Sequence, residues 1–521
     1  MNFTRHSFPR RRLSVLATAA VLTAIAGCTG GNPTGPVVPT GTDPSPAASS
    51  APTGGVTAST GRIQLLDVAP GKSASFLTQP GKQLTVIASA ASYAPPTPSF
   101  RLSVGGGSTA ASSAYGVLGT APQSTVEMPY SARFTASNAA TLRANGGQAP
   151  AGPRRLQAAT DREVGTTEQF WVNTGNSSAG GDVQRTAKLE RKTEHAYFYV
   201  DTEAQAISQA NLDKLATEFE QKIYPRVTAV FGPESKPGVD GDGRLFIVVS
   251  PAVDNFGKEK GLMGYFWSRD MLPTSGAGSH SNQKEALFMT DKLFDYPELT
   301  SFGTLAHEFQ HLINFSQKAI RSGYTMVEET WLDEGLAMYA MEVAGYGLPA
   351  GDKHIAKDLN EFQQTPSAYS LTDWSGNPHG FSYGQSYLFV RYMVDRHGPG
   401  VIKEILQATK AGQDGLDQVL AKRQSTFAGF FRDWTIANLI SGTPLAAGTA
   451  YQYKGLDLAG SYGGFDLAGF KTTPATSAEV TAGLRPWGSA YYTFDASQQK
   501  AWELKLGDGG ATRLLGAAIV P

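Results

Sequence analysis

Residues 304–315 read TLAHEFQHLINF, an apolar helical stretch interrupted on one side by two histidines and a glutamate. The chain has only 8 His among 521 residues, yet His307 and His311 stand four positions apart here. Residues four apart on an α-helix lie on the same face, so the two imidazoles can bind a single zinc ion. Glu308 faces the same cleft away from the ligand axis, where it can polarise a water that zinc activates. The alternative is a partly exposed helix whose histidines are only packed or hydrogen-bonded.

A catalytic zinc ion needs a third protein ligand and keeps its fourth position for water. Downstream, residues 331–337 read WLDEGLA, and the separation allows a turn and a second helix packed against the first. Glu334 is the predicted ligand, because its aromatic and aliphatic neighbours imply a buried setting where an unpaired carboxylate would be costly. Glu328 and Glu329 are competing candidates, and each could instead be a solvated charge before the helix starts.

The two motifs together resemble the gluzincin metallopeptidases, in which a Glu from a second helix completes a His/His/Glu site. Asp333 stands where the similar motif of aminopeptidase N relatives has Asn, and no Gly-x-Met-Glu-Asn motif of those enzymes is visible. Residues from about 185 to 442 look closer to the hyicolysin-type neutral metallopeptidases, through stretches such as KIYPRVTAVFG and VDGDGRLFIVVS. The resemblance implies an α+β, thermolysin-like catalytic domain that binds one catalytic Zn²⁺ and cleaves peptides or proteins.

Gluzincins commonly stabilise the tetrahedral oxyanion with a Tyr or His that follows the glutamate ligand. In the segment PHGFSYGQSYLFVRYM the candidates are His379, Tyr383 and Tyr387. Tyr383 is favoured by the resemblance, since related enzymes have a Tyr opening a helix at this point. Tyr387 has the helical spacing of a core residue, and His379 could equally be a hydrogen-bonding loop residue.

The N-terminus reads as a bacterial lipoprotein signal. Basic residues precede an apolar stretch that is too short for a comfortable membrane span, and Ile25-Ala26-Gly27-Cys28 resembles a lipobox. Cys28 is the only Cys of the chain, so it cannot form an internal disulfide, and lipidation there would anchor the protein to a membrane on the extracytoplasmic side. An ordinary cleavage site that happens to precede a Cys is the alternative.

Composition and pattern divide the chain into five parts. The Gly/Pro/Ser/Thr-rich part after Cys28 cannot bury enough apolar surface to order itself. Short apolar runs separated by turn residues predict β-strands in the parts that flank the zinc motifs. The expected divisions are a signal peptide (1–27), a disordered tether (28–61), a sandwich-like β-rich accessory domain (62–180), the catalytic domain (185–446) and a C-terminal β-rich region (447–521).

Three weaker expectations concern partners and ligands. The net charge of −1 and the absence of basic runs argue against a nucleic-acid partner. Asp240-Gly241-Asp242-Gly243 could bind Ca²⁺, although an ordinary turn fits the short motif better. Residues 281–288 are a candidate edge strand of the cleft, where an extended peptide could add as a further strand; a plain sheet strand is the alternative.

The sequence therefore predicts a lipid-anchored extracytoplasmic zinc endopeptidase. The alternative is a catalytically silent gluzincin scaffold that acts as a surface module for binding peptide or glycan. The presence of Glu308 speaks against it, since a pure binding scaffold has no need of that base. An exopeptidase is disfavoured because no acidic motif for an amino terminus is visible.

Overall fold

The structure is a computed structural model. It describes residues 56–57, 63–70, 73–77, 83–91, 99–104, 161–174, 181–205, 207–254, 263–272, 280–374, 382–475, 479–494, 501–506 and 513–520. The expected signal peptide and nearly all of the expected tether lie outside these residues. Val56–Thr57, at the end of the expected tether, form strand β1.

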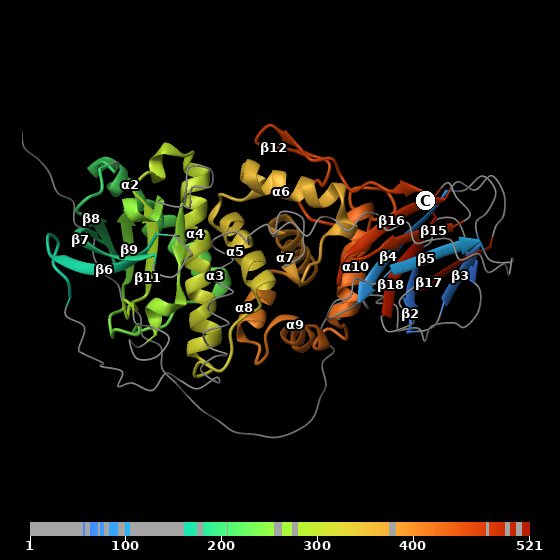
Figure 1. Ribbon diagram of the computed structural model, residues 1–521, viewed down its shortest axis with the longest axis horizontal. Coiled ribbons are helices and arrows are strands. Elements are labelled where there is room, and N and C mark those ends of the chain that lie inside the picture. Colours follow the sequence, from blue (N-terminus) through green and yellow to red (C-terminus); the bar gives the residue numbers. More distant parts are fainter. Residues whose placement is uncertain are drawn as a thin grey trace, which may run out of the picture. The chain divides into compact units, whose positions relative to one another are not determined.

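Helices and sheets are both present, as an α+β fold requires (Figure 1). The helices are α2 (Gln209–Glu218), α3 (Tyr224–Phe231), α4 (Glu298–Phe315), α5 (Thr330–Ala344), α6 (Lys353–Gln364), α7 (Tyr383–His397), α8 (Gly400–Gln407), α9 (Gly412–Ala421) and α10 (Phe427–Ile440). The π-helical segments Phe219–Ile223 and Ser316–Ile320 extend α2 and α4. The 3-10 turns are Pro251–Asp254, Ser268–Met271, Leu293–Asp295, Leu348–Ala350 and Pro366–Ala368.

A six-stranded sheet packs against α4, the helix that carries His307 and His311. Its order is β10 (Gly264–Phe266), β11 (Ala286–Thr290), β9 (Leu245–Ser250), β8 (Ala196–Asp201), β7 (Asp182–Lys192) and β6 (Thr167–Asn173). Strands β11, β9 and β8 run parallel to one another, and the remaining pairs of the sheet are antiparallel. Ile247 of β9 packs into the core shared with the helices, whereas Phe246 and Val248 pack on the opposite face. The strand is thus buried on both faces, as its continuous apolar run predicts.

Helices α4 and α5 lie side by side beside this sheet, with α7 next to α5 (Figure 1). Gly335 explains how closely α5 and α7 approach, since a Cβ added there would lie 2.8 Å from the backbone oxygen of Ser386. A larger residue would push α7 away from the helix that carries Glu334. Gly345 ends α5 in the left-handed conformation, with φ 93°.

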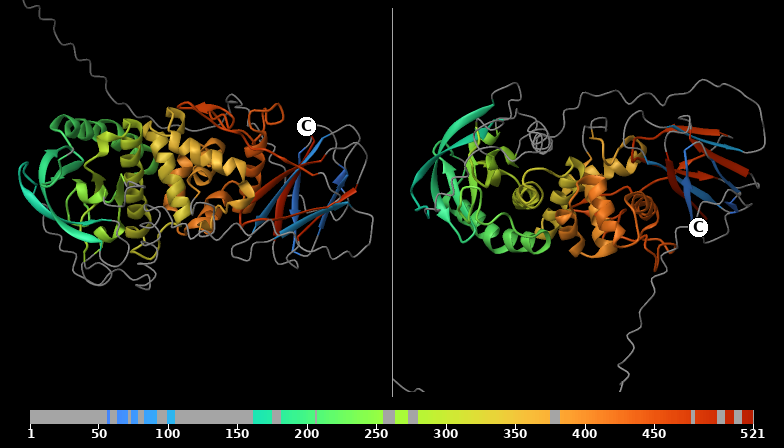
Figure 2. Two further views of the ribbon diagram at one scale, coloured as in Figure 1. Left: turned by 45° about the horizontal axis from the view of Figure 1, so that its top comes forward. Right: turned by 90° about the horizontal axis from the view of Figure 1, so that it is seen from below.

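Two five-stranded sheets combine strands from both ends of the chain. One has the order β1, β3 (Ser73–Leu77), β17 (Ala501–Leu506), β5 (Ser99–Val104), β15 (Glu479–Gly483). The other has the order β14 (Thr473–Pro474), β16 (Ser489–Phe494), β4 (Leu84–Ala91), β18 (Arg513–Ile519), β2 (Ile63–Val68). Figures 1 and 2 show the blue N-terminal strands interleaved with the red C-terminal strands. A separate two-stranded hairpin holds β12 (Ser461–Tyr462) and β13 (Phe465–Asp466).

The domain boundaries in the structure therefore differ from those predicted from the sequence. The expected 62–180 and 447–521 regions are not two separate β domains, because β17 lies between β3 and β5, and β18 lies between β4 and β2. Strand β6, expected in the accessory region, instead pairs with β7 in the six-stranded sheet. We call the two interleaved sheets the β-sandwich below.

The β-sandwich packs directly on the helical part of the chain. Ile87 and Ala517 of its second sheet share an apolar cluster with Ile436 of α10. The hydroxyl of Tyr491 donates a hydrogen bond to the backbone oxygen of Thr435, at 3.2 Å. The sandwich is thus in contact with the helices and not only tethered to them.

Candidate metal centre

His307 and His311 on α4 and Glu334 on α5 converge at one point. The two imidazole Nε2 atoms are 3.1 Å apart. Glu334 Oε2 lies 3.2 Å from His307 Nε2 and 3.5 Å from His311 Nε2. All three side chains are buried, and they form the fully buried group of His and acidic residues in the described chain that could hold an ion. The second helix predicted from the sequence thus brings Glu334 to the two histidines.

The geometry of these three atoms fits zinc. Ligands about 2.0–2.1 Å from a tetrahedral ion lie roughly 3.3 Å from one another, which agrees with the observed separations. Two imidazoles and one carboxylate are also the donor set of many catalytic zinc sites, where the fourth position stays open. His307, His311 and Glu334 are therefore the residues that would hold the ion.

The ionisation of the side chains in the centre favours binding of a cation. Burial alone would raise the pKa of Glu334, but the imidazoles of His311 and His307 outweigh it and lower that pKa to about 2. Burial lowers the pKa of His311, while the carboxylates of Asp333 and Glu334 outweigh it and raise that pKa well above its usual value. The centre thus has an ionised carboxylate that attracts positive charge, and His311 must give up its proton when an ion binds.

Asp333 contacts His311 at Nδ1, a contact that was not predicted from the sequence. Its Oδ2 lies 3.1 Å from His311 Nδ1, the ring nitrogen that faces away from Glu334. Asn314 donates a hydrogen bond to the other oxygen of Asp333. A carboxylate on Nδ1 fixes the ring with Nε2 available for a metal. The signal for this contact in the sequence is Asp333, which stands where the similar motif of aminopeptidase N relatives has Asn.

Glu308 is buried beside the histidines on α4. Its Oε2 accepts a hydrogen bond from the backbone N–H of Phe266 in β10, at 2.9 Å. Burial raises the pKa of Glu308, and the neighbouring His307 and His311 oppose this shift without cancelling it. The carboxylate is thus fixed between the helix and the end strand of the sheet.

The competing carboxylates have other partners. Glu328 Oε2 lies 3.0 Å from Lys318 Nζ in a buried ion pair, and Glu328 Oε1 accepts the N–H of Gly412 at 2.6 Å. Glu329 accepts a hydrogen bond from the indole N–H of Trp331, at 2.7 Å. Neither residue belongs to the group around His307 and His311. The geometry therefore favours Glu334 as the third ligand.

The oxyanion candidates fall in different settings. Tyr383 opens α7, and its ring centre lies 6.4 Å from that of His307. Tyr387 is buried and donates a hydrogen bond to Glu342 at 2.6 Å, as expected for a core residue. His379 lies outside the described residues. Of the two described candidates, Tyr383 is the one that lies near the centre.

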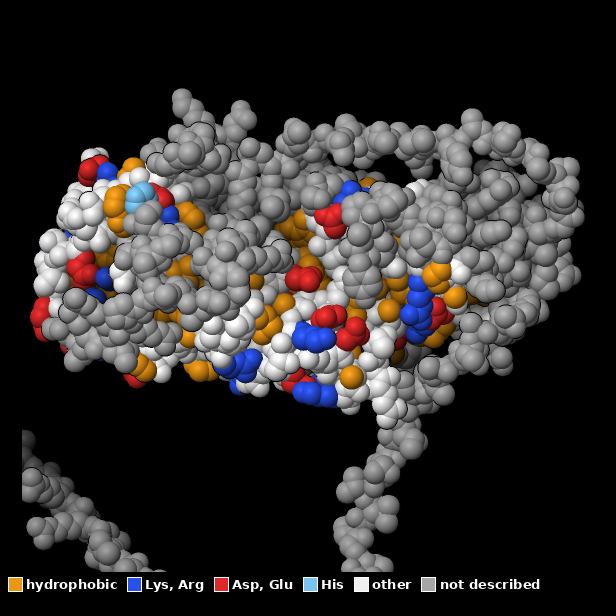
Figure 3. Space-filling model, turned by 60° about the horizontal axis from the view of Figure 1, so that its bottom comes forward, with side chains coloured by type: hydrophobic (Ala, Val, Ile, Leu, Met, Phe, Trp, Pro, Cys, Tyr) orange, Lys and Arg blue, Asp and Glu red, His pale blue; other side chains and the backbone are white. Residues whose placement is uncertain are grey.

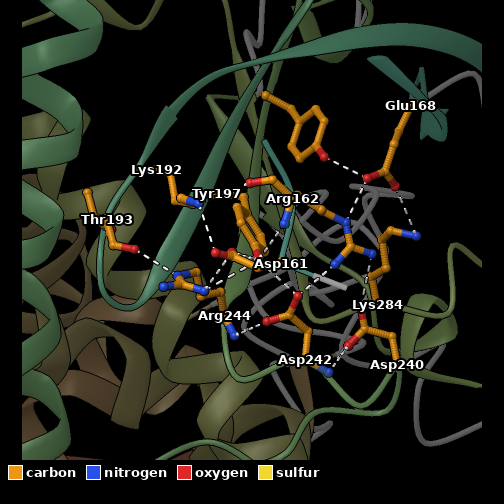
Figure 4. A network of polar contacts seen from close by, with 11 residues as sticks. Asp161, Arg162, Glu168, Lys192, Thr193, Tyr197, Asp240, Asp242, Arg244 and Lys284 are labelled. Atoms are coloured by element: carbon orange, nitrogen blue, oxygen red, sulfur yellow. Dashed lines mark hydrogen bonds and ion pairs between the residues drawn. The ribbon is translucent and has the colours of Figure 1, made fainter. Parts of the chain in front are cut away.

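The calcium expectation at Asp240 and Asp242 finds no support. The guanidinium of Arg162 stands between these carboxylates, with Nη1 2.7 Å from Asp242 Oδ2 and Nη2 3.5 Å from Asp240 Oδ2 (Figure 4). Tyr197 also donates a hydrogen bond to Asp242, at 3.0 Å. A cationic side chain therefore already neutralises this turn.

The edge strand of the sheet differs from the predicted one. Residues 281–288 contain the start of β11, which lies between β10 and β9 and is therefore not an edge. The edge near Glu308 is β10 instead. At the opposite edge, the side-chain amide of Asn282 accepts the N–H of Trp171 in β6 at 2.8 Å and donates to its carbonyl at 2.9 Å.

A further group of possible ligand atoms comprises Glu194, His195 and Glu220. It is partly exposed, and His195 Nδ1 already pairs with Glu220 Oε1 at 2.6 Å. This pairing accounts for the group without an ion.

Charge on one face of the molecule and the apolar character of the helices bear on possible partners. In Figure 3, acidic and basic side chains are interspersed on the face shown. Among the described residues, no helix is both long and apolar enough to cross a membrane. Cys28 is outside those residues, so lipid attachment and the absence of a nucleic-acid partner stay predictions.

Comparison with known proteins bears on the region that contains this centre. Over 229 residues the chain is 31% identical to the neutral metalloprotease ShpI of Staphylococcus hyicus, covering 42% of this chain and 50% of that protein. The chain thus matches about half the length of this relative. A crystal structure of an M1 zinc metallopeptidase from Deinococcus radiodurans aligns over 52% of this chain and 60% of its own, with 11% identity and a TM-score of 0.29, too low to support an argument.

Residues 161–456, more than half of the chain and including every residue of the centre, match the peptidase M30 family. The family resemblance seen in the sequence is confirmed, and the chain belongs to the peptidase M30 family.

Proposed function

We propose that the protein is a zinc-dependent endopeptidase whose metal ligands are His307, His311 and Glu334. The observation that carries this proposal is the convergence of their three donor atoms, 3.1–3.5 Å apart, beside the buried Glu308. When bound, a zinc ion would polarise the scissile carbonyl and lower the pKa of the attacking water. Similarity to a neutral metalloprotease supports the same class of activity.

Glu308 is the general base of the proposed reaction. The hydrogen bond from Phe266 holds its carboxylate in one orientation next to the histidines. From there it takes a proton from the attacking water and passes it to the leaving amine. The contact with β10 also links the base to the strand beside which we place the substrate.

The substrate binds as an extended peptide along the outer edge of β10. No strand pairs with this edge within the described residues, whereas Asn282 covers the opposite edge of the sheet at Trp171. An open edge offers backbone hydrogen bonds to an incoming strand. A peptide bound along β10 would place an internal peptide bond beside Glu308, as an endopeptidase requires. The pairing of α4 and α5 beside this edge supports a thermolysin-like organisation.

The wild-type protein tests this function directly. Purified protein is expected to contain about one zinc ion per chain and to cleave internal bonds in a peptide library, with loss of activity on chelation and recovery on adding zinc. Mass spectrometry of the products identifies the bonds that are cut. Release of single terminal residues would instead indicate an exopeptidase. Zinc binding without any cleavage would favour the silent scaffold that binds peptide or glycan.

Tyr383 is proposed to donate its hydroxyl to the oxyanion that forms during the reaction. Tyr383→Phe should therefore lower kcat by roughly 10²-fold, with zinc content and melting temperature nearly unchanged. Steady-state kinetics and metal analysis of the purified variant measure this. Tyr387→Phe is not a suitable control, because it removes a buried hydrogen bond to Glu342. Full activity of Tyr383→Phe would transfer the role to His379.

The location is proposed from the lipobox-like Ile25-Ala26-Gly27-Cys28. Cys28 should carry lipid and hold the mature protein on the extracytoplasmic face of a membrane, and Cys28→Ser should prevent lipidation. Mass spectrometry of the mature N-terminal peptide from membranes measures the modification. An unmodified peptide that starts at another residue would show that the protein is not a lipoprotein.

A further inference from the structure

The loop that joins β15 to β16 leaves the β-sandwich and enters the helical core. It consists of Leu484–Gly488, and its Trp487 is only 1% exposed. The indole ring centre lies 4.6 Å from that of Phe427 and 5.1 Å from that of Phe431, both in α10. A residue of the sandwich is thus part of the core on which the active-site helices pack.

The backbone of this loop is fixed from two sides. On the sandwich side, the N–H of Trp487 donates to the carbonyl of Ala90 in β4, at 2.8 Å. On the other side, the N–H of Leu371 donates to the carbonyl of Trp487, at 3.4 Å. Trp487 has φ 51°, a conformation that is uncommon for a residue with a side chain. Gly488 permits the close approach, because an added Cβ would lie 2.7 Å from the carbonyl oxygen of Tyr369.

Arg485 connects the same loop to residues 371–374, a segment that precedes α7 in the chain. Its Nη2 lies 3.1 Å from the carbonyl oxygen and 3.4 Å from a carboxylate oxygen of Asp373. Within that segment, the N–H of Asp373 donates to Ser370 Oγ at 2.9 Å. The indole N–H of Trp374 donates to the carbonyl of Leu371 at 3.2 Å. The loop therefore contacts residues 371–374 at two points, Leu371 and Asp373.

Trp374 connects residues 371–374 to Tyr383, which contacts His307 of the metal centre. The ring centres of Trp374 and Tyr383 are 5.4 Å apart, with planes at 77°, an edge-to-face arrangement. Tyr383 in turn lies edge-to-face with His307. A continuous series of contacts thus runs from Arg485 through Asp373 and Trp374 to Tyr383, the proposed oxyanion residue.

We propose that the loop Leu484–Gly488 of the β-sandwich positions Tyr383 through Trp374, so that the sandwich sets the geometry of the active site. This inference rests on the proposed function only for its effect on catalysis. Arg485 is a positioning residue in this scheme, since it contacts neither a metal ligand nor Glu308. Small displacements of a positioned group lower the reaction rate more than they alter substrate binding.

Arg485→Met tests the inference, because methionine keeps an apolar stem in place of the side chain but removes the donor to Asp373. Zinc-loaded full-length protein should lose on the order of 10-fold in kcat, with little change in KM or zinc content. In a Tyr383→Phe background, Arg485→Met should have no further effect on kcat, because both changes act on the same group. Arg485→Lys should restore part of the rate.

A spectroscopic readout makes the test independent of activity. With 3-fluorotyrosine at position 383, Arg485→Met should shift or broaden the ¹⁹F resonance. The matched control is Arg513→Ala, which removes a solvent-accessible ion pair with Asp67 between β18 and β2. It should leave both the resonance and kcat unchanged. If Arg485→Met does not fold, Trp374→Leu removes the aromatic contact with Tyr383 and should move the same resonance.

Each outcome decides between the proposals. An unchanged resonance and unchanged kcat in Arg485→Met would overturn the positioning role. A loss of kcat that adds fully to that of Tyr383→Phe would also overturn it, since Arg485 would then act elsewhere. If Tyr383→Phe alone is fully active, the oxyanion role is wrong, and the ¹⁹F resonance still decides whether the loop positions the ring.

Discussion

Glu308→Gln is expected to lower peptide hydrolysis by roughly 10³-fold while leaving about one zinc ion per chain. Glutamine has nearly the same shape and retains an oxygen that can accept the hydrogen bond from Phe266, so the local structure should persist. It cannot accept the proton of the attacking water, and the reaction loses its base. The three proposed ligands remain in place, which is why metal binding should not change.

The measurement combines metal analysis with single-turnover cleavage of the best library peptide. Glu329→Gln is the matched control, since it removes a carboxylate charge outside the group around His307 and His311 yet retains an acceptor for the indole of Trp331. It should keep both zinc and activity. Hydrolysis by Glu308→Gln at the wild-type rate would show that another group is the base.

Glu334→Ala should lose both zinc and activity. The substitution removes one of three donors and leaves His307 and His311, and two imidazoles alone bind the ion far more weakly. It also removes a carboxylate that stays ionised because of those imidazoles, with a pKa of about 2. The positively charged ion would then have no anionic ligand in the centre.

Zinc content after dialysis and thermal unfolding with and without added zinc measure this effect. A ligand that binds only the folded state stabilises it by about 4 kcal/mol at a concentration 1,000 times its Kd. The melting temperature of the wild type should therefore rise with zinc, while that of Glu334→Ala should respond little. Full zinc content in Glu334→Ala would return Glu328 or Glu329 to consideration, although Glu328 is held by Lys318.

The centre was predictable because its signals are local. The spacing of His307 and His311 places them on one helical face, and the apolar surroundings of Glu334 imply a second buried helix. The structure contains both helices and brings the three side chains together. The continuous apolar run of β9 likewise predicts its burial on both faces.

Features that depend on distant pairing were not predictable from the sequence. Strand β18 looks like any other apolar strand, and nothing local shows that it pairs with β2 and β4 instead of with its neighbours in the tail. The contact of Asp333 with His311 depends on how α5 docks on α4, and the edge position of β10 depends on the order of the whole sheet. Sequence patterns report which face of an element is apolar, but not which partner covers it.

The interleaving of the sandwich strands has a consequence for biogenesis. Chains are synthesised from the N-terminus, so β2–β5 emerge long before β17 and β18, with which they pair. Asp67 and Arg513, which pair across β2 and β18, are 446 residues apart in the chain. Such distant pairing folds slowly and leaves strand edges exposed to aggregation until it is complete. The helices of the metal centre can form earlier, during translation. Since the loop that contacts residues 371–374 belongs to the sandwich, the protein would gain its full activity only after β17 and β18 have been synthesised and have paired.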